Sequence, residues 1–187
     1  VFKGNKEKGL PCDDETASYW REEAGLPSDQ ILYFSEKDNF WEMADIGPCG
    51  PCSEIHIDLG TPACDRKEVS GHKCQINGDC GRYVEIWNLV FIQFNRLEDG
   101  SLKPLPEKHV DTGMGFERLV AVVQGKDSNY ETDLFSPILD EIVCITGKEL
   151  DFKKGIPHRV IADHLRMLSF ALADGAMPGN AGNGYVL

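Results

Sequence analysis

The chain has 187 residues, of which 41% are hydrophobic and 27% charged, as in a globular protein of one domain or one and a fraction. No apolar run approaches the roughly 20 residues that cross a bilayer and no signal peptide opens the chain, so we expect no membrane partner. The net charge of −12 argues against an extensive nucleic-acid surface, because such surfaces use Lys and Arg to neutralise phosphates.

The seven cysteines are not grouped like a disulfide scaffold in a chain of this length, which favours reduced thiols and a cytoplasmic location. The sequence starts at Val1 and stops at Leu187 within an apolar pattern, so we expect it to be part of a longer protein. Nothing in it indicates an oligomeric state.

The first predicted element is a helix over residues 13–25, capped by an aspartate, ended by Gly25, and burying Tyr19 and Trp20. The short run 31–34 predicts a strand. The glycines and prolines of residues 47–52 predict a tight loop. Alternation of apolar and polar residues then predicts a strand over residues 53–59.

Residues 60–82 are polar, rich in Gly and Cys and without periodicity, which indicates an insertion within a sheet. Residues 83–96 give the strongest strand pattern in the chain. Asn88 and Val90 are expected on one of its faces, and apolar residues on both faces predict a central strand. Asn88 needs a partner, because it is a polar side chain amid apolar neighbours.

After a turn at 98–100 and an extended stretch at 103–109, the remaining periodicity is helical. A Gly-rich turn leads into a helix that ends by Gly125, and two more helices are expected over 134–146 and 160–173. The last of these is expected to turn four residues largely inward, namely Val160, Leu165, Leu168 and Leu172. We place a domain boundary near residue 140.

The segment 111–118 combines a carboxylate, two glycines and an arginine at a strand-to-helix junction. Gly113 and Gly115 allow a ligand to approach the backbone closely, and the helix start favours an anion. Arg118 could add a bidentate phosphate contact, and Asp111 could hold an ammonium group or a metal. The alternative is a Gly-rich helix start without a ligand.

Four long stretches resemble the alanine-specific form of class II aminoacyl-tRNA synthetases, and they follow one another along the chain in the same order as in that family. Residues 110–119 resemble motif 3 of that class, and the others are residues 38–54, residues 85–96, and residues 159–166 with 174–175 and 184–187. Ser128 to Phe135 also fits, so the resemblance covers nearly the whole chain.

The resemblance implies an α+β fold, with an antiparallel sheet flanked by helices, followed by an α-helical segment. Residues 1–139 would form the C-terminal part of the aminoacylation domain, and residues 140–187 the start of a helical tRNA-recognition domain. It implies an alanine–tRNA ligase that uses ATP with Mg²⁺ to form alanyl-adenylate and then transfers alanine to the tRNA 3′ end. The tRNA(Ala) acceptor stem, alanine and ATP would be its partners.

The resemblance also implies roles for site residues. Asp111 would pair with the alanine ammonium, and Gly113 would leave room for the ligand. Asn88, Val90 and Trp41 would line the alanine pocket. Gly113, Gly115 and Arg118 would bind ATP, with Asp111 and Arg118 as the catalytic residues. Further along the chain, Asn180, Asp163 and Arg166 would approach the acceptor stem, with helix capping and loop hydrogen bonds as the alternative.

The insertion at 60–82 holds four soft or borderline metal ligands within 17 residues, namely Cys64, His72, Cys74 and Cys80. This set suits a tetrahedral Cys₃His Zn²⁺ site that staples the loop. The alternative is a mobile loop with reduced surface thiols. A second pair, Cys49-x2-Cys52 with His56 nearby, invites a metal or redox role, but the flanking prolines favour a structural loop.

The sequence departs from the family pattern at Ala44 to Gly47, where relatives have Gly-Asp-Thr-Gly, and at Asn183, where an arginine is usual. Motifs 1 and 2 of the class are missing, and Arg96-Leu97-Glu98 imitates the core of motif 2 by chance. The chain alone is therefore expected to lack full activity. The rival hypothesis is a non-catalytic, synthetase-like binding module stapled by zinc.

Overall fold

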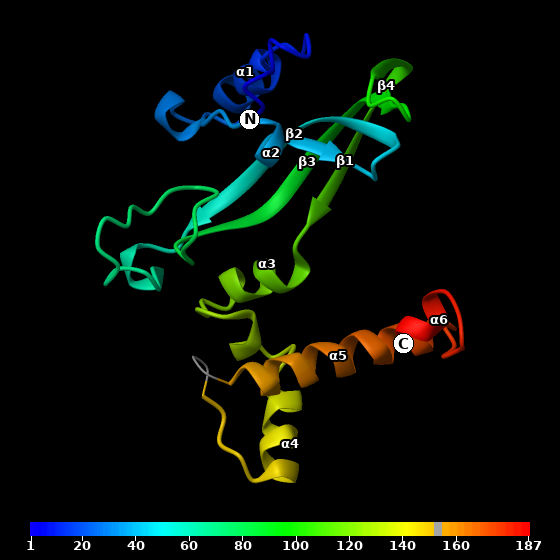
Figure 1. Cartoon of the computed structure of the whole chain (residues 1–187). Coiled ribbons are helices and arrows are strands. Elements are labelled where there is room, and N and C mark those ends of the chain that lie inside the picture. The colour runs from blue at the N-terminus through cyan, green and yellow to red at the C-terminus, as the bar shows by residue number, and fades with distance from the viewer. Residues whose placement is uncertain (152–154) are drawn as a thin grey trace. The chain divides into compact units, whose positions relative to one another are not determined.

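The computed structural model describes residues 1–151 and 155–187 (Figure 1). They form two compact units, Val1–Leu119 and Val120–Leu187. None of the helices in these residues combines the length and apolarity needed to span a bilayer.

The first unit is built on a four-stranded antiparallel sheet with strand order β1-β2-β3-β4 (Figure 1). The strands are β1 (Phe40–Glu42), β2 (Gly47–Asp58), β3 (Tyr83–Arg96) and β4 (Leu102–Met114). The helical segments before the sheet are α1 (Asp14–Glu22), η1 (Ser28–Gln30) and α2 (Glu36–Asn39). The predicted antiparallel sheet with flanking helices is therefore confirmed, and β3 is an inner strand with its predicted ends.

The predicted loop at residues 47–52 is wrong, because this segment forms the first half of β2. The register between β2 and β3 shifts between Cys49 and Cys52, next to Pro51, whereas Pro48 pairs regularly with Asn95. Gly50 is required there, since a Cβ at this position would lie 1.9 Å from the Phe91 carbonyl oxygen. The glycine thus permits close packing of two strands and does not make a turn.

Two other predictions for the N-terminal region need correction. Residues 31–34 form no regular strand; Phe34 makes a single parallel bridge to Phe2. The helix near residues 13–25 is present as α1, and the Asp13 carboxylate caps it by accepting from the Thr16 N–H at 3.1 Å. Tyr19, however, is 58% exposed.

Two contacts anchor the N-terminal region to the sheet. Trp20 Nε1 donates to the buried Ser53 hydroxyl at 2.8 Å, which fixes α1 against β2. A small core formed by Phe2, Leu10, Phe40 and Cys49 packs on β1 and β2. Burial of such apolar side chains stabilises a fold by about 1.5–3 kcal/mol each.

The segment between β2 and β3 contains only one short element, η2 (Thr61–Ala63), as predicted for an insertion. Its two ends are joined by a bidentate ion pair, in which Arg82 donates to Asp58 at 2.7 and 2.6 Å. These hydrogen bonds, with one from the Gly60 N–H, lower the pKa of Asp58 to about 2. The insertion is therefore tied closely to the end of the β2–β3 ladder.

The helix α3 (Phe116–Val123) begins in the first unit and ends in the second. The second unit continues with η3 (Asn129–Glu131), α4 (Ser136–Thr146), α5 (Ile156–Ala173) and α6 (Asn183–Val186). Gly147 ends α4 with a φ of 65°, the left-handed conformation that is common for glycine at the end of a helix, so the expected helix end at residue 146 is confirmed. The core of this unit is an apolar cluster of Phe135, Leu139, Ile142 and Ala162.

The predicted inward face of α5 is wrong, since Val160, Leu165 and Leu172 are exposed and Ala162 is the residue buried against α4. A helix with apolar residues around much of its circumference has no single face that periodicity can select. The units also divide about 20 residues before the predicted domain boundary. The predicted boundary near residue 140 separates an aminoacylation domain from a tRNA-recognition domain, and this functional division stays a prediction.

Candidate functional site

The register of the three long strands places the predicted ligand-binding residues on one face of the sheet. Val90 pairs with Asp111, and Asn88 pairs with Gly113. Directly opposed residues of an antiparallel pair point to the same side, as do residues two apart along a strand. Asn88, Val90, Asp111 and Gly113 therefore share a face, and no bulge interrupts the ladder between them.

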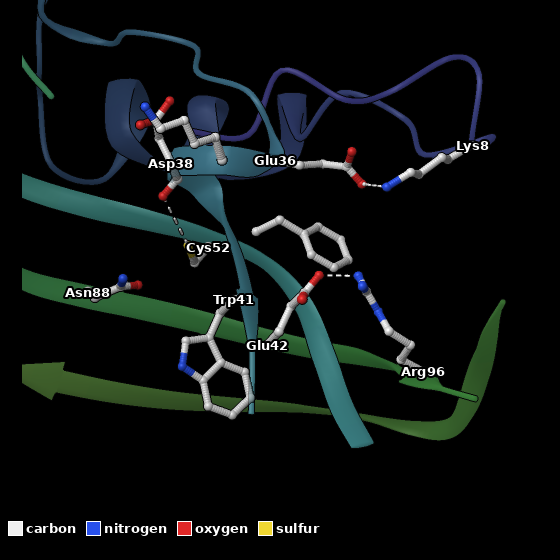
Figure 2. A pocket seen from close by; sticks show the side chains of 10 residues that line it. Lys8, Glu36, Asp38, Trp41, Glu42, Cys52, Asn88 and Arg96 are labelled. Carbon is white, nitrogen blue, oxygen red and sulfur yellow. Dashed lines mark hydrogen bonds and ion pairs between the residues drawn. The ribbon is translucent and has the colours of Figure 1, made fainter. Parts of the chain in front are cut away.

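A hollow of about 500 Å³ opens on the first unit and reaches Trp41 and Asn88 (Figure 2). Cys52 of β2 also lines it, and its thiol lies 4.0 Å from the carbonyl oxygen of Asp38. Most of the remaining lining is charged, with Lys8, Glu36, Lys37, Asp38, Glu42 and Arg96 around the rim. The structure thus brings Trp41 and Asn88 together, whereas Val90 of β3 and Asp111 and Gly113 of β4 do not line this hollow.

The two glycines of the segment 111–118 differ in what surrounds them. A Cβ on Gly113 would meet no atom within 4 Å, and the φ of Gly113 is not positive. A Cβ on Gly115 would lie 3.2 Å from Cδ of Arg118. Packing explains the glycine at 115, but neither packing nor backbone conformation explains the one at 113, which leaves open space beside Asn88.

Asp111 and Arg118 are both accessible to a ligand. Asp111 is exposed, and its carboxylate accepts from the N–H of Thr112 at 2.8 Å. Arg118, in the first turn of α3, donates to the carbonyl of Glu85 at 2.9 Å and lies 3.5 Å from the Glu85 carboxylate. The guanidinium is thereby held at the strand-to-helix junction, and its contact with a phosphate stays a prediction.

Cys52 contributes a neutral thiol to the hollow. Burial, reinforced by the nearby negative charge of Glu54, raises the pKa of Cys52 to about 11. Its motif partner Cys49 lies in the apolar core with Phe2 and Phe40. The structural interpretation of the Cys49-x2-Cys52 pair is thus the one that the packing favours.

Sequence reasoning missed three side chains of this face. Arg96 lines the hollow and makes an ion pair with Glu42 (Figure 2), although its motif was attributed to chance. Glu54 and His56 are the polar residues that alternate with Ile55 and Ile57 in the strand pattern of residues 53–59, yet their side chains are only 11% and 8% exposed. The alternation of polar and apolar residues correctly placed Glu54 and His56 on the same face of the strand, but it could not indicate that this face is covered.

The four predicted zinc ligands meet at one point in the insertion. The ligand atoms of Cys64, His72, Cys74 and Cys80 all lie within 4.8 Å of one another. The sulfur atoms of Cys64 and Cys74 lie 3.3 and 3.6 Å from His72 Nε2. A tetrahedral site with Zn–S bonds of about 2.3 Å places its ligand atoms ~3.8 Å apart, so these donors fit Zn²⁺.

A carboxylate supports this cluster from outside. Asp79 Oδ1 lies 3.5 Å from His72 Nδ1, while Asp79 Oδ2 accepts from Arg66 at 2.8 Å. A histidine that binds a metal through one ring nitrogen commonly donates its other N–H to a carboxylate. Asp79 thus favours the tautomer in which His72 Nε2 faces the three sulfur atoms.

In the second unit, two of the three predicted tRNA residues also make internal contacts. The carboxylate of Asp163 accepts a short hydrogen bond from the hydroxyl of Tyr130, and burial and this bond raise the pKa of Tyr130 to about 12. The guanidinium of Arg166 lies over the rings of Phe135 and Phe170. Asn180 is exposed in the loop between α5 and α6.

Comparison with known proteins identifies the family. A family model described as "tRNA synthetases class II (A)" matches residues 7–187. The chain is 55% identical to an alanine–tRNA ligase of Bacteroides thetaiotaomicron, with all of the chain and 21% of that protein aligned. It is 58% identical to an alanine–tRNA ligase of Chlorobium chlorochromatii, over 94% of the chain and 19% of the relative. A Flavobacterium psychrophilum alanine–tRNA ligase is 50% identical over the whole chain and 22% of its own length.

The chain thus spans about a fifth of the length of these relatives. Within that span, the resemblance noted from motif 3 and the strand of residues 85–96 is confirmed. The match extends over almost every residue, and the antiparallel sheet with its helices agrees with it. The chain belongs to the class II tRNA synthetases.

Proposed function

We propose that these residues form part of the site at which a full-length alanine–tRNA ligase activates alanine with ATP and passes it to tRNA(Ala). The observation that carries this proposal is the strand register that sets Asn88 and Val90 beside Gly113 and Asp111. It gathers an amide, an apolar side chain, a carboxylate and an open surface on one face. These are the groups that a small α-amino acid requires.

In this proposal the exposed Asp111 carboxylate pairs with the alanine ammonium, and the amide oxygen of Asn88 accepts from the same group. Val90 and Trp41 limit the size of the side chain. The open surface at Gly113 would admit the reacting carboxylate and the ATP α-phosphate. Gly115 leaves room for the side chain of Arg118, whose guanidinium would bind the γ-phosphate. Mg²⁺ would neutralise the phosphates when ATP is bound, and the chain contributes mainly positioning and charge stabilisation.

The test is alanine-dependent ATP–pyrophosphate exchange by the full-length gene product, followed by alanylation of tRNA(Ala). Replacing Asp111 with asparagine should lower kcat/KM for alanine by at least about 10-fold, because the ammonium loses the negative charge of its partner and keeps at most a weaker hydrogen bond to a neutral amide. Asp99→Asn is the matched control, since that carboxylate only accepts from Ser101 in the β3–β4 turn. Exchange by the parent protein with another amino acid and none with alanine would refute the proposal, and a full-length protein without any exchange would favour the non-catalytic binding module.

We also propose that the cluster of Cys64, His72, Cys74 and Cys80 binds Zn²⁺. The convergence of their ligand atoms and the support of His72 by Asp79 favour this metal. The purified protein should contain about one zinc ion per chain, and Cys74→Ser should lose it. Cys144→Ser is the control because Cys144 is an exposed, unpaired cysteine on α4. A parent protein without zinc after expression in zinc-supplemented medium would contradict the site.

The tRNA contacts of Asn180, Asp163 and Arg166 remain proposals. Among them Asn180 is the most accessible, whereas Asp163 also holds Tyr130 against α5. A cytoplasmic location likewise stays a prediction from the unpaired cysteines. Substituting Asn180 with alanine should weaken alanylation without changing pyrophosphate exchange, because the first step needs no tRNA.

A further inference from the structure

Glu54 and His56 form an almost buried pair on β2, next to Asn88 of the proposed alanine site. His56 Nε2 lies 3.0 Å from Glu54 Oε2, and the two side chains are 8% and 11% exposed. A carboxylate removed from water is costly unless partners satisfy it. The roles assigned to the site so far explain neither residue.

The second oxygen of Glu54 faces Asn88. Glu54 lies directly opposite Asn88 in the β2–β3 ladder, and Asn88 Nδ2 donates to Glu54 Oε1 at 3.4 Å. An ionised carboxylate can only accept hydrogen bonds, so the NH₂ end of the amide must turn toward it. The carboxylate therefore determines which end of the Asn88 amide points elsewhere.

That other end is the amide oxygen, which is buried and has no hydrogen-bond partner among the described residues. A buried acceptor without a donor costs about 1–3 kcal/mol. Such a cost is removed when a ligand brings an N–H group to the oxygen. The α-ammonium of an amino acid has three N–H donors. Asp111, on the neighbouring strand β4, can accept from some of them, which leaves a donor for the oxygen of Asn88.

We propose that Glu54 is a positioning residue for the amino-acid substrate, and that His56 holds it in place. Glu54 fixes the amide of Asn88 so that its oxygen, and not its NH₂ group, is presented to the substrate ammonium. This inference rests on the proposed function, since it takes alanine as the ligand. It adds two residues of β2 to a site otherwise assigned to β1, β3 and the motif-3 segment.

The test is the Glu54→Gln variant of the full-length gene product in ATP–pyrophosphate exchange. A neutral amide at position 54 accepts and donates, so Asn88 is free to turn its NH₂ group toward the ammonium. The KM for alanine should rise about 10-fold, as expected for a weakened hydrogen bond to a charged group, while the KM for ATP stays unchanged. Asp58→Asn, a matching carboxylate-to-amide change on the same strand, should leave both constants unchanged.

A rescue variant distinguishes positioning from a general structural role. In Glu54→Gln combined with Asn88→Asp, the amide at 54 donates to the carboxylate at 88, which again presents an oxygen to the ammonium. This double variant should recover most of the alanine KM that Glu54→Gln loses. Asn88→Asp alone sets a second carboxylate against that of Glu54, so this variant should bind alanine more weakly than the double variant. Comparing these two variants still tests the inference if Glu54→Gln alone does not fold.

An unchanged alanine KM in Glu54→Gln, an equal rise in both KM values, or a double variant no better than its single parents would overturn the inference. In each of these cases the parent protein still exchanges pyrophosphate with alanine. If the parent has no alanine-dependent exchange, the proposed function fails instead. The two failures are thus separate results.

Discussion

Gly113 offers a way to separate what the fold needs from what a ligand needs. We predict that Gly113→Ala leaves the β3–β4 ladder at least as stable as before, yet impairs the binding of alanine and ATP. The added methyl group meets no protein atom within 4 Å. It would stand on the open surface that faces Asn88 and Asp111.

The expected change in stability can be worked out from the backbone. Because Gly113 has no positive φ, alanine can adopt its conformation, and the smaller freedom of the unfolded chain stabilises the fold by about 0.4–1 kcal/mol. The functional change has the opposite sign. A displacement of a substrate by about 1 Å can lower the rate of its reaction ~100-fold, so kcat/KM for alanine should fall by at least one order of magnitude.

Gly50→Ala is the matched control for stability. A Cβ at residue 50 would lie 1.9 Å from the Phe91 carbonyl oxygen and 3.0 Å from the Gln93 nitrogen. Both are backbone atoms of β3, so the strands must separate, at a cost of about 1–3 kcal/mol or more. The same substitution at the two sites should therefore change stability in opposite directions.

Hydrogen exchange of β3 and β4 peptides in the full-length gene product measures the local stability, and pyrophosphate exchange measures the function. Gly113→Ala should show equal or slower amide exchange together with reduced activity, whereas Gly50→Ala should show faster amide exchange. Faster amide exchange in Gly113→Ala, or unchanged kcat/KM for alanine, would refute the assignment of an open ligand surface to this glycine.

Three further results are expected. Asp79→Ala should weaken Zn²⁺ binding by about 10-fold or more, measured by chelator competition, because His72 loses the partner that orients it; unchanged affinity would count against this role. Cys52 should react with iodoacetamide at pH 8 far more slowly than the exposed thiols. Its rate of reaction should rise as the pH approaches its pKa of about 11, since only the thiolate is nucleophilic, and rapid labelling at pH 8 would contradict its burial. Trp20→Phe should destabilise the first unit by about 1–3 kcal/mol, seen as faster hydrogen exchange in α1 and β2, because it leaves the buried Ser53 hydroxyl without its donor.

The elements that the sequence predicted well have patterns that depend on few neighbours. The ends of β3 were predicted correctly because apolar residues on both faces are bounded by polar turns. The end of α4 follows from Gly147 alone, which adopts the left-handed conformation. The insertion, and the convergence of Cys64, His72, Cys74 and Cys80 within it, also required only local spacing.

The errors arose where a residue type serves tertiary packing. Glycine and proline at 47–52 usually indicate a turn, but Gly50 serves here to let two strands approach. Leu165 and Leu172 look like core residues of α5 and are exposed. Glu54 belongs to the polar side of its alternating strand, and no local pattern shows which strand lies opposite or how deeply this face is covered. The pairing of Glu54 with Asn88 required the register of β2 against β3, and the register depends on contacts distant in sequence.

The most direct test of the shared ligand face is a crystal structure of the full-length gene product with a non-hydrolysable alanyl-adenylate analogue. We predict that the ammonium nitrogen lies at hydrogen-bond distance, about 2.7–3.2 Å, from the Asp111 carboxylate and from the amide oxygen of Asn88, with Gly113 beneath the acyl group. An analogue bound on the opposite face of the sheet, or with its ammonium away from both residues, would contradict the account.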